Sequence, residues 1–270
     1  LGLRARKPEL ALHQVDAFTD AIFAGNPAAV CVLEEPLPDA TMQAIATENN
    51  LSETAFNRRT GDDYTIRWFT PTVEIDLCGH ATLASAFVVL ELLEPQRDVV
   101  VFESQKHGAL SVRRERDRLA MDFPADPPKR LERFDPDLAR ALGAGPVEQW
   151  LAGYWMVVFE CEAQVRSLRP DLVALARMRP GEVIVTAPAD DPELDFVSRF
   201  FGPGVGIDED PVTGSAHCVL APYWAARLGK SRLRARQVSA RGGELECVVE
   251  GDRVELIGRC VRYSSGRVTI

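Results

Sequence analysis

Glu53 is a residue of this sequence whose type and position could move a proton. It lies in the segment 51–56 (LSETAF), which has the pattern of a strand, and it shares one strand face with Leu51 and Ala55. A carboxylate on an apolar face is costly unless it is paired or protonated. Desolvation raises the pKa of a carboxyl group toward neutrality, where it can act as a general base or acid. An edge-strand glutamate in water is the alternative that the pattern leaves open.

Two turns of small residues each precede an apolar helix, and they suggest where an anion would bind. Cys78-Gly79-His80-Ala81 and Thr213-Gly214-Ser215-Ala216 lie 135 residues apart, half of the 270-residue chain. The first N–H groups of a helix have no partner within it, and with the helix dipole they bind carboxylates or phosphates. Glycines that merely permit a tight turn are the alternative. If the two halves face each other, both helix starts can bind one small anionic substrate between them.

His80 and Asp210 place titratable groups beside these two turns. His80 directly follows Gly79 and could donate a hydrogen bond to a substrate or relay a proton. A structural role for this histidine stays open. Pro211 restricts Asp210 to an extended conformation, so the loop directs a carboxylate to the start of the second helix. A capping role for Asp210 or Thr213 is the alternative.

The elements around these motifs predict an α+β fold, with many strands and few helices. In the first half, we expect a helix that starts at Asp39 as its N-cap and ends near Asn49. In the second half, the segment 164–168 has the pattern of a strand, and Pro170 is expected to open a helix. The last predicted helix runs from Ser215 to Leu228, with Gly229 after it.

A proline-rich stretch near residues 124–128 divides the chain close to its midpoint. We therefore predict two domains, 10–123 and 129–270, with the last strand able to return to the first domain. Residues 1–9 are set aside from the fold prediction. They carry positive charge but no apolar core, so we do not expect a secretory signal.

The composition of the chain argues against several kinds of binding partner. The chain is 46% hydrophobic and 26% charged, which is typical of soluble globular proteins, and its net charge of −9 disfavours nucleic acid. No apolar run approaches the roughly 20 residues of a membrane span, so no membrane contact is expected. Six cysteines without a CxxC pair indicate reduced thiols in a cytoplasm. The four histidines lack metal-ligand spacing, so we expect no metal site.

Taken together, four motifs resemble those of the PhzF-type phenazine-biosynthesis isomerases. They occur in order along residues 13–270: Gly25-Asn26-Pro27, the segment 50–56, the segment 78–82 and the segment 209–216. The resemblance implies a diaminopimelate epimerase-like fold of two pseudo-symmetric domains, each a curved, mostly antiparallel sheet around a central helix. It also implies a site in the cleft between the domains, no cofactor or metal, and a homodimer.

The resemblance also implies roles for single residues. Glu53 falls on the family's base, and His80, Asp210 and Ser215 fall on its other catalytic residues. The family's backbone donors for the substrate carboxylate fall on Gly79, His80, Gly214 and Ser215. In the phenazine enzyme, the glutamate moves a proton between ring carbons of trans-2,3-dihydro-3-hydroxyanthranilate. We therefore predict a cofactor-independent isomerase that moves a proton on a small carboxylated metabolite.

Two other functions stay open. Racemases and epimerases of this fold use two cysteines, one from each half. Here Cys78 occupies the first such position, but the second is Thr213, whose hydroxyl is far too weak an acid to replace a thiol. A racemase that uses Cys78 is one alternative, and a non-catalytic module that binds a metabolite is the other.

Overall fold

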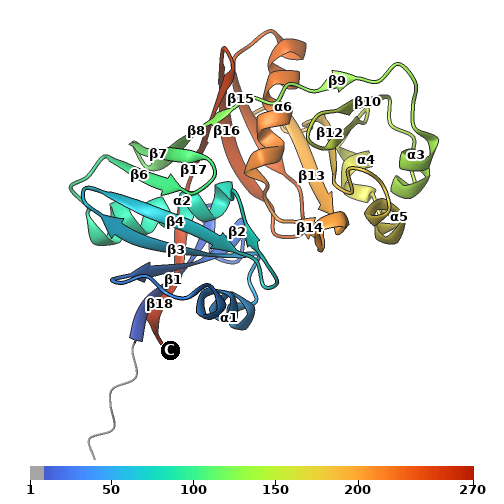
Figure 1. Cartoon of the computed structure of the whole chain (residues 1–270). Helices are drawn as coiled ribbons and strands as arrows, with labels where there is room; N and C mark the ends of the chain where they lie inside the picture. Colours follow the sequence, from blue (N-terminus) through green and yellow to red (C-terminus); the bar gives the residue numbers. More distant parts are fainter. Residues whose placement is uncertain (1–8) are drawn as a thin grey trace, which may run out of the picture. The chain divides into compact units, whose positions relative to one another are not determined.

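A computed structural model describes residues 9–270 and divides the chain into two compact units (Figure 1). Unit 1 holds the segment up to Phe23, Pro27–Leu119 and Arg259–Ile270, and unit 2 holds Ala24–Asn26 and Ala120–Gly258. Residues 1–8, most of the segment set aside above, lie outside the described residues. The division into domains 10–123 and 129–270, each expected to fold on its own, stays a prediction.

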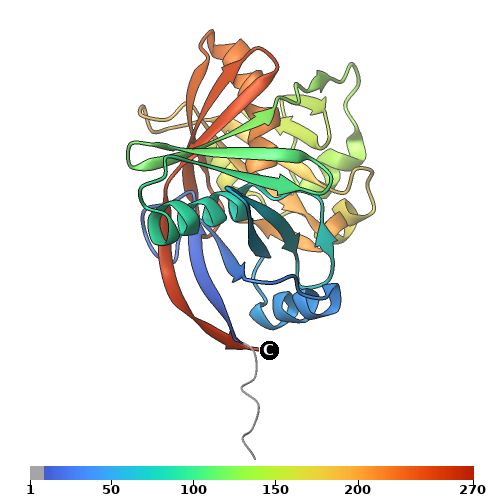
Figure 2. The same ribbon diagram turned by 60° about the vertical axis from the view of Figure 1, so that its left-hand side comes forward.

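The described residues of unit 1 form a sheet and two α-helices. Helix α1 is Asp39–Asn49, and α2 is Gly79–Phe87, which continues as a π-helical segment, Val88–Leu93. Its strands are β1 (Glu9–Ala17), β2 (Asn26–Leu33), β3 (Glu53–Thr60), β4 (Asp63–Phe69), β5 (Glu74–Ile75), β6 (Val99–Ser104), β7 (Gly108–Glu115) and β18 (Cys260–Thr269). Strand β8 (Arg118–Pro124) runs from unit 1 into unit 2. The last strand, β18, pairs antiparallel with the first, β1, and Figure 2 shows the two side by side in red and blue.

Strand β3 has two buried faces, because a helix covers each of them. Phe56 packs with Met42 and Ala46 of α1 in one hydrophobic cluster. Glu53 and Ala55 alternate with it and lie on the opposite face, where α2 contacts β3. Every residue of α2 from His80 to Ala86 is buried, as expected for a helix without a polar face.

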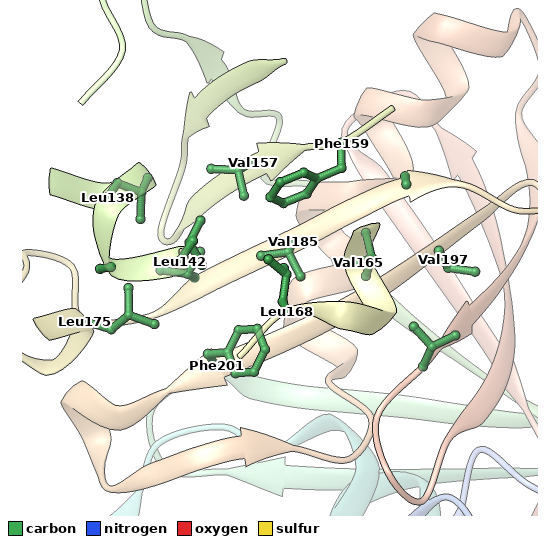
Figure 3. Close-up of a cluster of buried hydrophobic side chains, with 14 residues drawn as sticks. Leu138, Leu142, Val157, Phe159, Val165, Leu168, Leu175, Val185, Val197 and Phe201 are labelled. Carbon is green, nitrogen blue, oxygen red and sulfur yellow. The ribbon is translucent and has the colours of Figure 1, made fainter. Parts of the chain in front are cut away.

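Unit 2 contains several short helices and one long helix, α6. The helices are α3 (Pro136–Leu142), α4 (Glu162–Ser167), α5 (Leu172–Ala176), a 3-10 turn (Pro203–Val205) and α6 (Gly214–Leu228). The strands are β9 (Lys129–Arg130), β10 (Glu148–Leu151), β11 (Trp155–Val158), β12 (Val183–Pro188), β13 (Phe196–Gly202), β14 (Ile207–Asp210), β15 (Arg232–Gln237), β16 (Gly243–Glu250) and β17 (Arg253–Gly258). Helices α3, α4 and α5 pack on β11, β12 and β13 through a buried cluster that includes Leu138, Val165, Leu175, Val185 and Phe201 (Figure 3).

The two units repeat one order of strand pairings. In unit 1, β2 is parallel to β3, β3 antiparallel to β4, β4 parallel to β6, and β6 antiparallel to β7. Unit 2 follows the same order: β11 is parallel to β12, β12 antiparallel to β13, β13 parallel to β15, and β15 antiparallel to β16. Helix α2 precedes β6 and α6 precedes β15, so the two small-residue turns are equivalent positions. The predicted α+β fold with two related halves is confirmed.

Two local predictions about the ends of helices were wrong. Pro38, not Asp39, is the N-cap of α1, and the Asp39 carboxylate pairs instead with Arg67 of β4 at 2.8 Å. Helix α5 begins at Leu172, and the preceding Asp171 caps it by accepting a hydrogen bond from the Ala174 N–H. Pro170 therefore lies outside the helix that it was expected to open.

The segment 164–168 is helical rather than a strand. It lies mostly in α4, where Gln164 Oε1 accepts hydrogen bonds from the N–H groups of Glu160 and Cys161. Val165 and Leu168, three residues apart, both enter the hydrophobic cluster of unit 2. Over so few residues, helical spacing of apolar side chains is easily mistaken for alternation.

Candidate active site

In unit 1, Glu53 and His80 form a buried pair. Glu53 is the first residue of β3 and His80 the second of α2, and each side chain belongs to a residue about 5% exposed. Glu53 Oε2 lies 3.0 Å from His80 Nε2. The apolar face that the sequence predicted for Glu53 is therefore the face covered by α2.

Local structure explains how Glu53 comes to start a strand at this place. Helix α1 ends at Asn49. Its C-cap residue, Asn50, has a φ of 49°, the left-handed conformation that asparagine tolerates better than most residues. The Asn49 side chain then donates a hydrogen bond to Thr54 Oγ1 at 3.1 Å. Glu53 pairs in register with Ala28 of the parallel strand β2. The chain reversal after α1 thus fixes the register that directs Glu53 toward α2.

Cys78 contacts the opposite side of the same imidazole. It is the N-cap residue of α2, and its Sγ lies 3.5 Å from His80 Nδ1. Burial raises the pKa of the Cys78 thiol and Glu53 adds to this, while His80 acts in the opposite direction. Burial alone would lower the pKa of His80, but Cys78 and Glu53 outweigh it and raise that pKa well above its usual value. Both neighbours of the ring therefore favour its protonated form.

Glu53, Cys78 and His80 each offer a possible metal ligand, and these atoms lie within 4.8 Å of one another. However, Nε2 of the imidazole faces the carboxylate and Nδ1 faces the thiol. A metal ion at either ring nitrogen would replace the contact that this nitrogen makes with Glu53 or Cys78.

In unit 2, Asp210 holds together the loop before α6. Its Oδ1 accepts a hydrogen bond from Asn26 Nδ2 at 2.9 Å, and its Oδ2 accepts one from the Thr213 hydroxyl. Gln237 of β15 donates to the Asp210 carbonyl at 2.7 Å and accepts from the Thr213 N–H at 2.9 Å. The carboxylate is buried and both of its oxygens are hydrogen-bonded. Its contacts within unit 2 are those of a group that fixes the start of α6.

Ser215, the second residue of α6, is exposed and contacts a tyrosine. Its Oγ accepts a hydrogen bond from the Tyr154 hydroxyl at 3.0 Å. The Tyr154 ring packs edge-on against Phe200, with 5.2 Å between centroids. Burial raises the pKa of Tyr154, so its hydroxyl remains a donor at neutral pH. Tyr154 therefore orients a hydroxyl group at the N-terminus of α6.

The two helix starts that were predicted to bind an anion share one feature, the lack of a capping hydrogen bond from the N-cap side chain. Among the described residues, neither N-cap side chain, Cys78 in α2 or Thr213 in α6, makes a capping hydrogen bond. The N–H groups of the first turn of each helix therefore have no side-chain cap from that residue. Gly79 and Gly214 are the first residues of these helices, as the sequence predicted.

The structure brings some predicted residues together and adds others. Glu53, His80 and Cys78 meet in unit 1, and Asp210 meets Thr213 in unit 2. Asn26 belongs to a motif that the sequence singled out without giving it a role. Tyr154 and Gln237 had no signal in the sequence, because each meets its partner only through the pairing of distant strands.

Comparison with known proteins agrees with this architecture. A predicted epimerase of Pseudomonas aeruginosa has the same fold, with a TM-score of 0.72 over 97% of this chain and 99% of that one at 19% identity. A PhzF-family protein of Enterococcus faecalis is more similar, with a TM-score of 0.94 and 45% identity over 97% of this chain and all of that one. The two units thus form an epimerase-like fold.

The sequence comparisons identify the family within that fold. The model of the PhzC-PhzF family, described as phenazine biosynthesis-like proteins, matches residues 15–266. An uncharacterized isomerase of Pseudomonas aeruginosa is 52% identical over 96% of this chain and 98% of its own length. The chain belongs to the phenazine biosynthesis-like (PhzC-PhzF) family. Within the described residues, no helix combines the length and the apolar character needed to cross a bilayer.

Proposed function

We propose that this protein is an isomerase that moves a proton between two carbon atoms of a small carboxylated metabolite, with Glu53 as the base. The reaction would resemble the isomerisation of trans-2,3-dihydro-3-hydroxyanthranilate and would need no cofactor. The observation that carries the proposal is the buried contact of 3.0 Å between Glu53 Oε2 and His80 Nε2. Relatives that cover nearly the whole chain are named isomerases, which supports the same class of reaction.

The pair suits a proton that leaves one carbon and returns to another. The Glu53 carboxylate takes a proton from a substrate carbon and becomes a carboxylic acid, and the electron pair of the broken C–H bond stays on the substrate. Glu53 then gives the proton to a second carbon and is a carboxylate again. His80, as an imidazolium, compensates the charge of Glu53 in a place from which water is largely excluded.

The start of α2 supplies a place for the substrate carboxylate. The N–H groups of Gly79 and His80 lie in its first turn, next to the Glu53–His80 pair. Gly214, Ser215 and Asp210 of unit 2 stay predictions as substrate-binding and catalytic residues. The homodimer and the cytoplasmic location stay predictions as well.

The test is the exchange of substrate protons with solvent. A panel of small cyclic and open-chain carboxylates is incubated with the protein in deuterated water and followed by proton NMR. We expect deuterium at a carbon of at least one compound. Glu53→Gln keeps the size and polarity of the side chain but removes the base, so we expect exchange to fall by at least about 1000-fold.

Glu162→Gln is the matched control, because Glu162 is also a buried glutamate (6% exposed), on α4 of unit 2. It pairs with Arg166 and lies outside the proposed site. We expect this variant to keep the exchange activity. Undiminished exchange in Glu53→Gln would show that another group removes the proton.

A further inference from the structure

We propose that Cys78 is a positioning residue for His80, whose imidazole it holds through Nδ1 so that Nε2 faces Glu53. The inference deepens the proposed function and rests on it, since it concerns the partner of the proposed base. It assigns to Cys78 a role other than direct attack on the substrate.

The geometry places the imidazole between two partners. Cys78 Sγ lies 3.5 Å from His80 Nδ1, and Glu53 Oε2 lies 3.0 Å from His80 Nε2. The side chains of His80 and Glu53 are only 6% and 7% exposed, and Cys78 is 6% exposed. A ring held at both nitrogens in a buried place cannot turn without losing both contacts. The orientation of His80 therefore depends on Cys78 as well as on Glu53.

A thiol is a suitable partner for a histidine in either of its protonation states. The sulfur is a weak acceptor for the N–H of an imidazolium, and the S–H group is a weak donor to the lone pair of a neutral imidazole. Cys78 can therefore stay hydrogen-bonded to Nδ1 before and after His80 gains or loses a proton. An alanine would leave Nδ1 buried without that partner, which is the costly way to lose a hydrogen bond.

The same surroundings oppose a direct role for Cys78 as a carbon base. That role requires the thiolate, whereas burial and the neighbouring Glu53 raise the pKa of this thiol. The equivalent position in unit 2 is Thr213, whose hydroxyl donates to Asp210. The thiol pair that a two-thiol racemase needs is therefore not formed at these two equivalent positions.

The first test measures the protein without any substrate. The chain has four histidines, and nitrogen NMR of their imidazoles is the measurement. A His80→Gln variant identifies the signals that belong to His80. We expect Cys78→Ala to lower the pKa of His80, because the variant loses the hydrogen bond at Nδ1 that favours the protonated ring. We expect Cys78→Ser, which again offers a donor and an acceptor, to restore the pKa toward that of the parent protein.

Cys31→Ala is the matched control for the loss of a buried thiol. Cys31 lies on β2 of the same unit, is fully buried, and packs in the hydrophobic cluster on the α1 side of β3. We expect Cys31→Ala to reduce thermal stability but to leave the His80 signals unchanged. An unchanged His80 pKa in folded Cys78→Ala, or an equal change in Cys31→Ala, would overturn the inference.

The second test is kinetic and uses the substrate found by deuterium exchange. A lost hydrogen bond to a charged group corresponds to about a 10-fold effect or more, so we expect Cys78→Ala to lower kcat by about 10-fold. KM should change less, and Cys78→Ser should recover most of the rate. Loss of exchange in Cys78→Ser as severe as in Glu53→Gln would overturn the inference and indicate a thiol that reacts with substrate. The NMR test needs no substrate, so the role of Cys78 can be refuted while the proposed function holds. The proposed function can likewise be refuted while the role of Cys78 holds.

Discussion

Acid is expected to destabilise unit 2 through His217, a fully buried residue of α6. The Nδ1–H group of its imidazole donates to the Thr213 carbonyl at 2.7 Å, and the ring stacks on Phe196 with 6.0 Å between centroids. Burial lowers the pKa of His217 from 6.5 to about 4. Among the described residues, its Nε2 has no hydrogen-bond partner, so a second ring proton would be buried without an acceptor.

The size of the effect follows from the two pKa values. The unfolded chain binds a proton at His217 once the pH falls below about 6.5, whereas the folded chain binds it only near pH 4. The stability that depends on the neutral ring is therefore complete above pH 6.5 and is lost as the pH falls toward 4. At about 1.36 kcal/mol per unit, the full loss is about 3 kcal/mol, of which about 2 kcal/mol is lost by pH 5.

Urea unfolding between about pH 8 and pH 5 measures this loss, with tryptophan fluorescence as the signal. Trp150, Trp155 and Trp224 all lie in unit 2. His217→Asn does not titrate and keeps an amide donor near the Thr213 carbonyl, so its unfolding free energy should depend less on pH than that of the parent. His107→Asn, at an exposed position, should keep the parent's dependence. Identical pH dependence in the parent and His217→Asn would refute the reasoning.

Two further predictions concern the start of α6. Tyr154→Phe removes the hydrogen bond of 3.0 Å to Ser215. Steady-state kinetics should therefore show a KM raised by about 5-fold, with kcat and the melting temperature nearly unchanged. A lower kcat at constant KM would contradict this prediction. Asp210→Asn replaces an oxygen that accepts a hydrogen bond with an NH2 group, which is a donor and faces the donor of Asn26 or Thr213. Urea unfolding should therefore show a free energy of unfolding that is lower by about 2 kcal/mol. An unchanged free energy of unfolding would mean that these hydrogen bonds do not hold the loop.

The sequence predicted the parts of the unit 1 site but not how they meet. The alternation in 51–56 placed Glu53 on an apolar face, and the small-residue turn placed His80 at the start of a helix. Their contact depends on β3 packing against α2, and local patterns carry no information about which distant elements pack together. The family resemblance supplied that relation, because its motifs group residues that are far apart in the chain.

Errors occurred where short segments were interpreted alone. The five residues 164–168, four of which lie in α4, were too few to distinguish a helix from a strand. Pro170 fits several positions near a helix start. Tyr154 and Gln237 could not be found from the sequence. Each is an ordinary polar residue on or beside a strand, and only the order of strands in unit 2 brings it to the loop before α6.

The pairing of β1 with β18 has a consequence for synthesis on the ribosome. Unit 1 uses both the first described strand and the last one, because Glu9 pairs with Thr269 and Ala17 with Cys260. Chain elongation is slow compared with the folding of most small domains, so the parts that emerge early wait for the late ones. Unit 2 is therefore complete in the nascent chain before β18 is made, and β1 stays without its partner until β18 has been made.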